Sequence, residues 1–433
     1  MKPREQSSAK NEKPQGGRPS RVRSFLQSAG PGVITGAADD DPSGITTFSI
    51  AGARFGTSLL WTALLTWPLM AAVQMMCARI GMVTGQGLAG VWRKKFPRPL
   101  LIAVAVALLA ANTLNIAADL AGMADAAEML SGINSNLFVI LFGVVIAAAT
   151  VWLPYHRIAA VLKWLALTLV AYIGAALLLR PDWGSVLRHT FIPSLPNGKE
   201  AWQTLVAILG TTISPYLFFW QASQEVEEEK ALGRNMLMKR MGATHRELVN
   251  RQIDVGVGTF SSNLVIFFVM ITTALTLNVH GITQIESSRE AAEALRPLAG
   301  DFAAILYTVG LFGVGFLAIP TLSGSAAYAF AETFAWRGGL DQKLRRARGF
   351  YSIVILSTAL GIVLDFADTN PIQLLFWSAI LNGLLAPFLL VGILIVASDR
   401  EIMRDQPSSR LARFTVGLTA LLMFAAAAGM FVL

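Results

Sequence analysis

Long apolar stretches separated by short polar segments run through most of the chain. The hydrocarbon core of a bilayer is about 30 Å thick and needs about 20 mainly apolar residues in each helical span. Stretches of this length, bounded by charges, proline or glycine, recur from residue 30 onward. The pattern predicts eleven membrane-spanning helices, near residues 30–55, 57–80, 99–126, 136–154, 157–179, 202–224, 254–277, 301–331, 350–367, 372–397 and 411–432.

The first of these spans is interrupted in its middle. Asp39, Asp40 and Asp41 stand between two segments that contain proline and glycine, residues 30–32 and 42–44. Proline removes a backbone donor and clashes with the preceding helical turn, so it breaks the helix and frees carbonyl groups. Hydrocarbon cannot satisfy such groups, so the break is expected to line a cavity or an ion.

The sixth span carries a similar interruption, Gly210-Thr211-Thr212-Ile213-Ser214-Pro215-Tyr216. Broken helices at the first and sixth positions match an inverted repeat of five plus five helices, followed by one extra helix. The predicted fold is therefore all-α. It forms one transporter domain over residues 29–433, with repeats at about 29–180 and 200–397 and the extra helix at 411–432. Residues 1–28 are predicted to be a disordered, basic cytoplasmic tail without a signal peptide.

Composition agrees with a membrane protein: 54% of the residues are hydrophobic and only 14% are charged. The net charge of +8 does not indicate nucleic-acid binding, because lysine and arginine recur in every second loop, at 93–95, 230–251, 337–348 and 400–413. By the positive-inside rule this places the N-terminus in the cytoplasm and the C-terminus outside, in a plasma or inner membrane.

Few residues are suited to catalysis or to soft metals. The single cysteine, Cys77, lies in an apolar span, and the four histidines lie outside apolar centres. No nucleophile and base are paired within the spans, so an enzyme is not predicted. No cofactor and no protein partner are evident; the expected partners are the lipid bilayer and a transported ion.

Asp41 is the strongest candidate for binding that ion. A carboxylate in mid-membrane costs about 2.5 to 3.5 kcal/mol on insertion scales, which indicates a functional role. Thr211 and Ser214 offer hydroxyls from the other break, and both breaks offer carbonyls. One carboxylate with neutral oxygens suits a hard cation such as Mg²⁺, Ca²⁺ or Mn²⁺, and Mg²⁺ sheds its water most reluctantly. Alternatively, the two hydroxyls only satisfy local backbone groups.

Other polar residues near the spans have less definite roles. Asp39 and Asp40 either attract cations into the vestibule or are solvated or capping groups. Asp119, in the third span, either relays protons or pairs with a buried cation. Glu225 either lines the inner exit or is a solvated helix end.

These residues resemble the Nramp family of divalent metal transporters. The match runs from residue 30 to Asp41-Pro42, continues through 51–56, and recurs at 78–85, 118–121 and Pro215. The resemblance covers nearly the whole chain in the order of its spans. It implies the leucine-transporter fold, alternating access and a metal site between the first and sixth helices.

The chain departs from the usual family pattern at the metal site. Where the family has Asp-Pro-Gly-Asn, the asparagine position is Gly44, and where it has Met-Pro-His, the methionine and histidine positions are Ser214 and Tyr216. The acidic residue expected three positions after Asp119 is Gly122. These substitutions resemble the Nramp-related magnesium transporter branch. They imply uptake of Mg²⁺, and also Mn²⁺, without proton coupling, through a site that accepts a partly hydrated ion.

The sequence therefore predicts a metal site at Asp41, Gly44, Thr211 and Ser214, with Asp39, Asp40, Asp119, Tyr216 and Glu225 as relay or vestibule residues. Two other functions stay open. A proton-coupled Mn²⁺/Fe²⁺ symporter would use Asp41 and Asp119 for coupling, and an organic-solute symporter could have the same fold.

Overall fold

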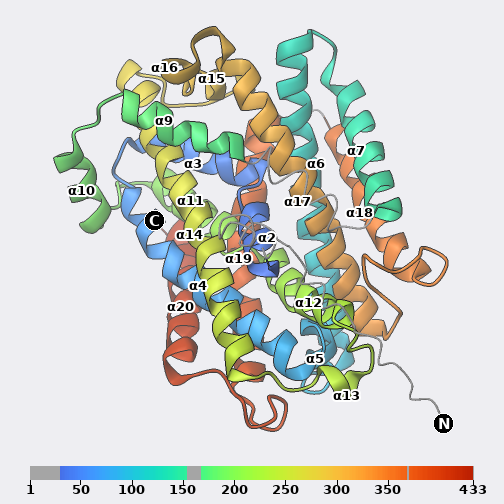
Figure 1. Ribbon diagram of the computed structural model, residues 1–433. Coiled ribbons are helices and arrows are strands. Elements are labelled where there is room, and N and C mark those ends of the chain that lie inside the picture. The colour runs from blue at the N-terminus through green and yellow to red at the C-terminus, as the bar shows by residue number, and fades with distance from the viewer. Residues whose placement is uncertain (1–29, 154–166, 368–369, 433) are drawn as a thin grey trace, which may run out of the picture.

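The computed structural model describes residues 30–153, 167–367 and 370–432 (Figure 1). In this part of the chain the secondary structure is helical. Among the described residues, nine helical segments are long and apolar enough to cross a bilayer. The first predicted span is divided into two shorter helices, and residues 157–166 of the fifth predicted span, together with the predicted tail, lie outside the described residues.

The first half of the chain forms α2 (Pro31–Asp39), α3 (Pro42–Phe55), α4 (Leu60–Thr84), α5 (Leu88–Trp92), α6 (Arg98–Ser131), α7 (Ser135–Trp152), the 3₁₀ turn η1 (Leu167–Val170), α9 (Ala171–Leu178) and α10 (Trp183–Phe191). The second half forms α11 (Lys199–Thr212), α12 (Pro215–Ala231), α13 (Leu237–Arg240), α14 (His245–Thr276), η2 (Asn278–His280), α15 (Ser288–Glu293), α16 (Arg296–Ala299), η3 (Gly300–Phe302), α17 (Ala303–Phe334), α18 (Arg348–Asp365), α19 (Pro371–Ser398) and α20 (Arg410–Val432).

Both predicted helix breaks are present. Pro42 occupies the first turn of α3 and Pro215 the first turn of α12, where the missing N–H of proline costs no helical hydrogen bond. Asp40 and Ile213, which end the preceding helices, have non-helical ψ angles of 48° and 60°. Each break therefore ends one helix and begins another within the bundle.

α14 begins at His245, well before the predicted start at 254. Thr244 caps it: its hydroxyl accepts from the N–H of Glu247, and the Glu247 carboxylate accepts from the N–H of Thr244. This reciprocal pair stabilises the first turn although the surrounding sequence is charged. The predicted loop 230–251 is therefore partly helix, and Arg251 belongs to α14.

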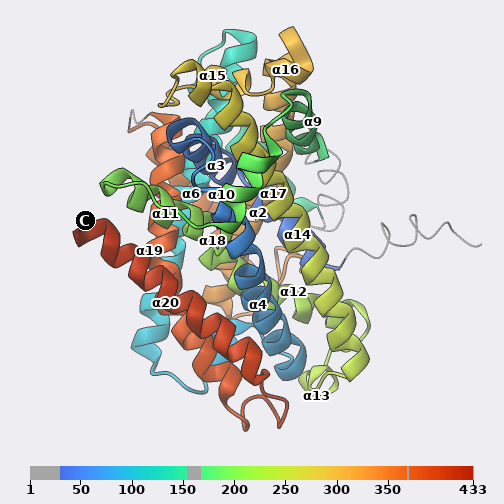
Figure 2. The ribbon, with the colours of Figure 1, turned by 90° about the vertical axis from the view of Figure 1, so that its left-hand side faces the viewer.

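The two broken helices lie inside a shell of longer ones. α2 and α3 pack on α14, α11 packs on α19, and α12 packs on α4 and α17. α6 packs against α17, α18 and α19, while α20 lies along the outside of the bundle against α19 and α11 (Figure 2). Both breaks are thereby enclosed by protein, as backbone without helical hydrogen bonds requires in a membrane.

Candidate metal site

Asp41 is the residue that joins the two halves of the broken first helix. It has extended backbone angles (φ −68°, ψ 169°) and is the N-cap of α3. Its Oδ1 accepts a hydrogen bond from the N–H of Gly44 at 2.6 Å. The positive end of α3 therefore stabilises the carboxylate, although its side chain is nearly fully buried.

The second oxygen of Asp41 faces other helices. Asn115 of α6 donates from Nδ2 to Asp41 Oδ2 at 3.1 Å, and the Tyr216 hydroxyl of α12 lies 3.5 Å from the same oxygen. Tyr216 also donates to the carbonyl of Ala38, at 3.0 Å, in the last turn of α2. Asn382 of α19 donates to Oδ1 of Asn115 at 3.2 Å, which fixes the orientation of the Asn115 amide.

At Gly44 the two breaks approach each other closely. A Cβ atom built on Gly44 would lie 3.1 Å from the Thr211 hydroxyl oxygen and 3.4 Å from Asp41 Oδ1. Oxygens from both broken helices therefore border the position where the usual family pattern has asparagine. Three of the four predicted metal-site residues, Asp41, Gly44 and Thr211, are brought together here.

Ser214 is near the same break, but its hydroxyl is already used. It donates to the carbonyls of Gly210, at 2.9 Å, and Thr211, at 2.6 Å. This is the local backbone role that the sequence left as an alternative, because the hydroxyl replaces donors lost at the break. In this conformation the Ser214 hydroxyl hydrogen is directed to the backbone of its own helix.

Asp119 lies one helical turn after Asn115 on α6, so both side chains leave the same face of the helix. It is fully buried, and neither of its carboxylate oxygens has a hydrogen-bond partner. A buried carboxyl group without partners is costly when charged. Asp119 is therefore suited to holding a proton or to meeting a cation that enters the site.

Asp39 and Asp40 point toward α14. Both accept from the Ser262 hydroxyl, at 3.0 Å and 2.7 Å respectively. Oδ1 of Asp39 has no hydrogen-bond partner, and both residues are buried, so the solvated alternative for them is wrong in this conformation. Asp39 and Asp40 therefore lie between Asp41 and α14.

Glu225 is not a solvated helix end either. Its side chain is 1% exposed and pairs with Arg251 at 2.8 Å. It lies more than two turns beyond Tyr216 on α12, which places it away from the Asp41 carboxylate.

The described residues contain no group of three or more His, Cys, Asp or Glu side chains placed to hold a metal. An ion at Asp41 would therefore depend on one carboxylate, neutral oxygens and its own water. Sequence reasoning missed Asn115 and Asn382. Their only signal was an amide within an otherwise apolar span, and the sequence alone did not show which faces of α6 and α19 meet the break.

Comparison with known proteins agrees with this arrangement. The family described as "Natural resistance-associated macrophage protein-like" (Nramp) matches residues 32–433. The chain belongs to the Nramp family. It is therefore a multi-pass membrane transporter and not an enzyme, and the predicted all-α leucine-transporter-type fold is confirmed.

Several Nramp relatives resemble the chain over most of its length. A protein of Caldanaerobacter subterraneus named "Divalent metal cation transporter MntH" is 29% identical, with 93% of this chain and 94% of the relative covered. The protein of the same name from Deinococcus radiodurans is 28% identical, with coverage of 89% and 85%.

A solved structure of the Eremococcus coleocola manganese transporter has a TM-score of 0.70 at 18% identity, covering 96% of this chain and 90% of the other. The amino-acid-bound transporter MhsT has a TM-score of 0.59 at 14% identity, covering 92% of this chain and 98% of the other. At these identities the two structures support the fold alone.

Proposed function

We propose that this Nramp transporter carries Mg²⁺, and also Mn²⁺, into the cell without proton coupling. Its family membership makes it a divalent metal transporter. The choice of metal is based on the chemical groups around Asp41. Asp41 supplies carboxylate oxygens, and the described groups that hydrogen-bond to it, from Gly44, Asn115 and Tyr216, are an N–H, an amide and a hydroxyl, with no thioether, thiolate or imidazole among them. Such a site favours a hard cation over a soft one.

The glycine at position 44 supports an ion that keeps part of its water. An asparagine there would bring one more protein ligand, and its Cβ atom would press on the Thr211 hydroxyl. With glycine the chain offers no side-chain ligand at this position, so an ion at Asp41 keeps a water molecule in place of the amide. Mg²⁺ usually keeps several waters when proteins bind it.

The membrane potential is sufficient to drive this uptake. Moving one charge across 100 mV is worth about 2.3 kcal/mol, so a divalent cation gains about 4.6 kcal/mol on entering a cell that is negative inside. No proton gradient is needed for accumulation.

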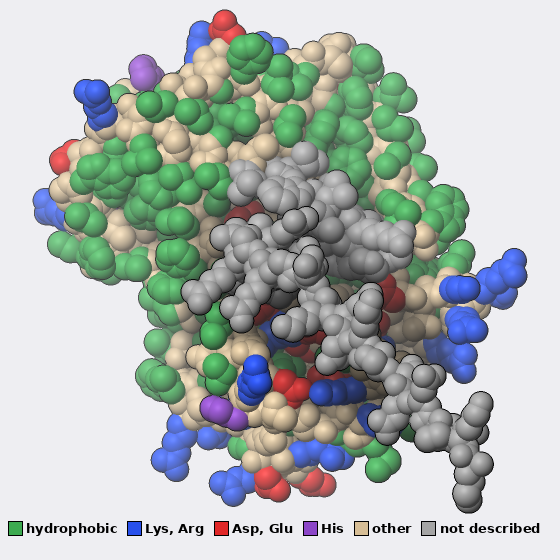
Figure 3. Space-filling view, viewed as in Figure 1, with side chains coloured by type: hydrophobic (Ala, Val, Ile, Leu, Met, Phe, Trp, Pro, Cys, Tyr) green, Lys and Arg blue, Asp and Glu red, His purple; other side chains and the backbone are tan. Residues whose placement is uncertain are grey.

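We also propose that the basic end of the molecule faces the cytoplasm. The segments rich in lysine and arginine follow α5, α12, α17 and α19, and these four helices end in the lower half of Figure 1. Figure 3 shows hydrophobic side chains over most of the upper part of one face, with many basic side chains around the lower end. This distribution supports a cytoplasmic N-terminus, an outer C-terminus and a plasma-membrane location.

The two breaks support an inverted repeat. We propose repeats over about 29–180 and 200–397, with α20 as the extra helix after them. In each repeat the first helix is broken immediately before a proline, Pro42 or Pro215.

A proton-coupled Mn²⁺ symporter is the second candidate, and one observation favours it. Asp119 is a buried carboxyl without partners on the same face as Asn115, which contacts Asp41. Such a group could take up a proton when Asp41 releases its metal. The names of two similar proteins, a divalent metal cation transporter MntH and a manganese transporter, agree with this candidate.

Measurements of uptake into proteoliposomes distinguish the uncoupled Mg²⁺ transporter from the proton-coupled Mn²⁺ symporter. Mg²⁺ uptake is measured with Mn²⁺, Ca²⁺ and Cd²⁺ as competitors, at a negative inside potential, with a pH dye in the lumen. Our proposal expects saturable Mg²⁺ uptake, competition by Mn²⁺ and an unchanged lumenal pH. Acidification of the lumen when Mn²⁺ or Cd²⁺ is added, together with no Mg²⁺ uptake, would support the symporter instead.

A further inference from the structure

The short helix α2 lies against α14 with the two backbones in direct contact. A Cβ atom on Gly36 would lie 2.5 Å from the carbonyl oxygen of Gly258, and one on Gly258 would lie 2.3 Å from the carbonyl oxygen of Gly32. Only glycine permits such an approach. These three residues form what we call the glycine seam.

A carboxylate of α14 holds the start of α2 in this position. The Asp254 side chain accepts from the N–H of Gly30 at 3.0 Å and from the N–H of Gly32 at 2.8 Å. The first N–H groups of a helix have no partner within the helix and carry its positive partial charge. Asp254 therefore acts as a cap that belongs to a different helix.

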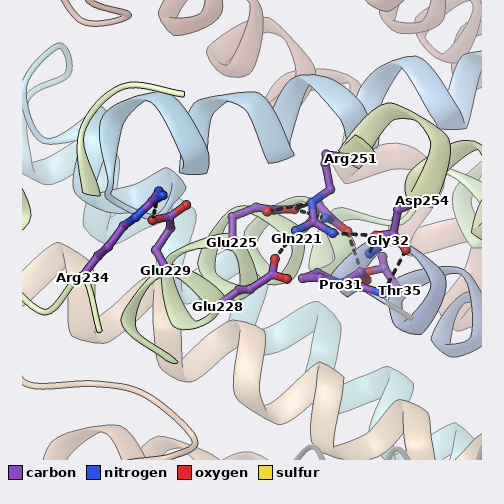
Figure 4. Close-up of polar contacts among 11 residues, drawn as sticks. Pro31, Gly32, Thr35, Gln221, Glu225, Glu228, Glu229, Arg234, Arg251 and Asp254 are labelled. Carbon is purple, nitrogen blue, oxygen red and sulfur yellow. Dashed lines mark hydrogen bonds and ion pairs between the residues drawn. The ribbon is translucent and has the colours of Figure 1, made fainter. Parts of the chain in front are cut away.

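Arg251 in turn holds Asp254. It donates to Oδ2 of Asp254 at 2.6 Å, and it pairs with two carboxylates of α12, Glu225 at 2.8 Å and Glu228 (Figure 4). The Arg251 side chain is only 9% exposed. One guanidinium thus joins α12 to α14 at the point where α14 holds α2.

A second set of hydrogen bonds returns from α12 to α2. Gln221 donates to Glu225 at 2.7 Å, and the Thr35 hydroxyl donates to the side-chain oxygen of Gln221 at 2.6 Å. α2 is therefore held at its first turn by Asp254 and one turn later by Gln221, and both of these residues are linked to Arg251 (Figure 4).

We propose that Asp254, held in place by Arg251, is a latch that keeps α2 on α14 and closes the pathway between Asp41 and the basic end of the molecule. Asp39 and Asp40 immediately follow α2 and lie against Ser262 of α14. Movement of α2 away from α14 opens these contacts and exposes the carboxylates next to Asp41. The latch must therefore be released before an ion leaves toward the basic loops.

The charges of the latch also suit an exit for cations. A single guanidinium faces three carboxylates, those of Glu225, Glu228 and Asp254. When α2 leaves, Asp254 loses both backbone donors, and the negative charge of the group is less compensated. A path with this charge attracts a divalent cation away from Asp41. This inference rests on the proposed transport through the first break.

Access to α2 can be measured without transport. In full-length protein with Cys77 replaced by serine, Thr35→Cys is the reporter, because Thr35 is fully buried against Gln221. Labelling by a membrane-impermeant maleimide is compared in vesicles that expose the basic loops and in vesicles of the opposite orientation. Asp254→Ala removes a charged partner of two N–H groups, so labelling from the basic side is expected to rise about tenfold.

Matched controls distinguish the loss of the latch contacts from a general loosening of the helix bundle. Arg251→Ala is compared with Arg234→Ala, because Arg234 also pairs with two carboxylates, Glu229 and Glu247, but does not contact α2. Asp254→Ala is compared with Asp399→Ala, a carboxylate paired with Lys95 at 2.7 Å. The controls are expected to label like the reporter alone.

Equal labelling of Asp254→Ala and Asp399→Ala, or increased labelling from the opposite side, would overturn the latch. Should Asp254→Ala fail to fold, Asp254→Asn keeps the shape and removes the charge, and an increase of several-fold is still expected. The labelling result does not depend on the transported metal. Failure of Mg²⁺ uptake with a positive labelling result would therefore reject only the proposed substrate.

Discussion

The two broken helices use their polar side chains in opposite ways. At the first break, the Asp41 carboxylate accepts from its own helix through Gly44 and also faces α6 and α12 through Asn115 and Tyr216. At the second break, the Ser214 hydroxyl returns to the carbonyls of its own helix. The comparison indicates that the first break supplies the charge of the site, whereas the second supplies shape and uncharged oxygens.

The strongest test of this comparison removes the charge. Asp41→Ala is expected to reduce Mg²⁺ uptake in proteoliposomes to the background of empty vesicles, because Asp41 is the carboxylate held at the break by Gly44 and Asn115. Asp399→Ala is the matched control. If Asp41→Ala takes up Mg²⁺ at the wild-type rate, the assignment of the metal site to this break is wrong.

The second largest effect is expected from loss of the Asn115 amide, which contacts Asp41. Asn115→Ala is expected to lower kcat/KM for Mg²⁺ uptake by about 10- to 100-fold, as loss of a group that orients a metal ligand does. Asn112→Ala is the control, since Asn112 is also buried on α6 but bonds to Leu322 and Ser325 instead. Equal losses in both variants would show a general packing effect.

A substitution at Gly44 tests the choice of metal. Gly44→Asn is expected to shift the ratio of Mn²⁺ to Mg²⁺ uptake about fivefold toward Mn²⁺, because the amide replaces a water that Mg²⁺ prefers to keep. Competition between the two ions in the same vesicles measures the ratio. An unchanged ratio would mean that this position does not set selectivity.

The smallest effects separate the two hydroxyls of the second break. Thr211→Ala removes an oxygen that borders the space at Gly44, so KM is expected to rise about threefold, of the order of one lost neutral hydrogen bond. Ser214→Ala is expected to change KM less than twofold and to lower thermal stability instead. The reverse order would make Ser214 the ligand of the second break.

The sequence predicted the breaks, the fold and the central position of Asp41, because proline, glycine and charge within an apolar span have few structural solutions. It did not predict how the other polar groups are used. Asn115 could be placed in a span but not on a face, and Arg251 was assigned to a cytoplasmic loop although it is a buried partner of three carboxylates. Such pairings depend on how helices far apart in the chain meet, which hydrophobic spacing does not encode.

The glycine seam has a thermodynamic consequence for the opening of the transporter. Where Gly32, Gly36 and Gly258 meet, backbone touches backbone, and these three positions bring no side chain into the contact. The heat-capacity change of a transition follows mainly from the apolar surface that it exposes to water. Separation of α2 from α14 along this seam should therefore have a small heat-capacity change. The enthalpy difference between the closed and open forms is then nearly independent of temperature.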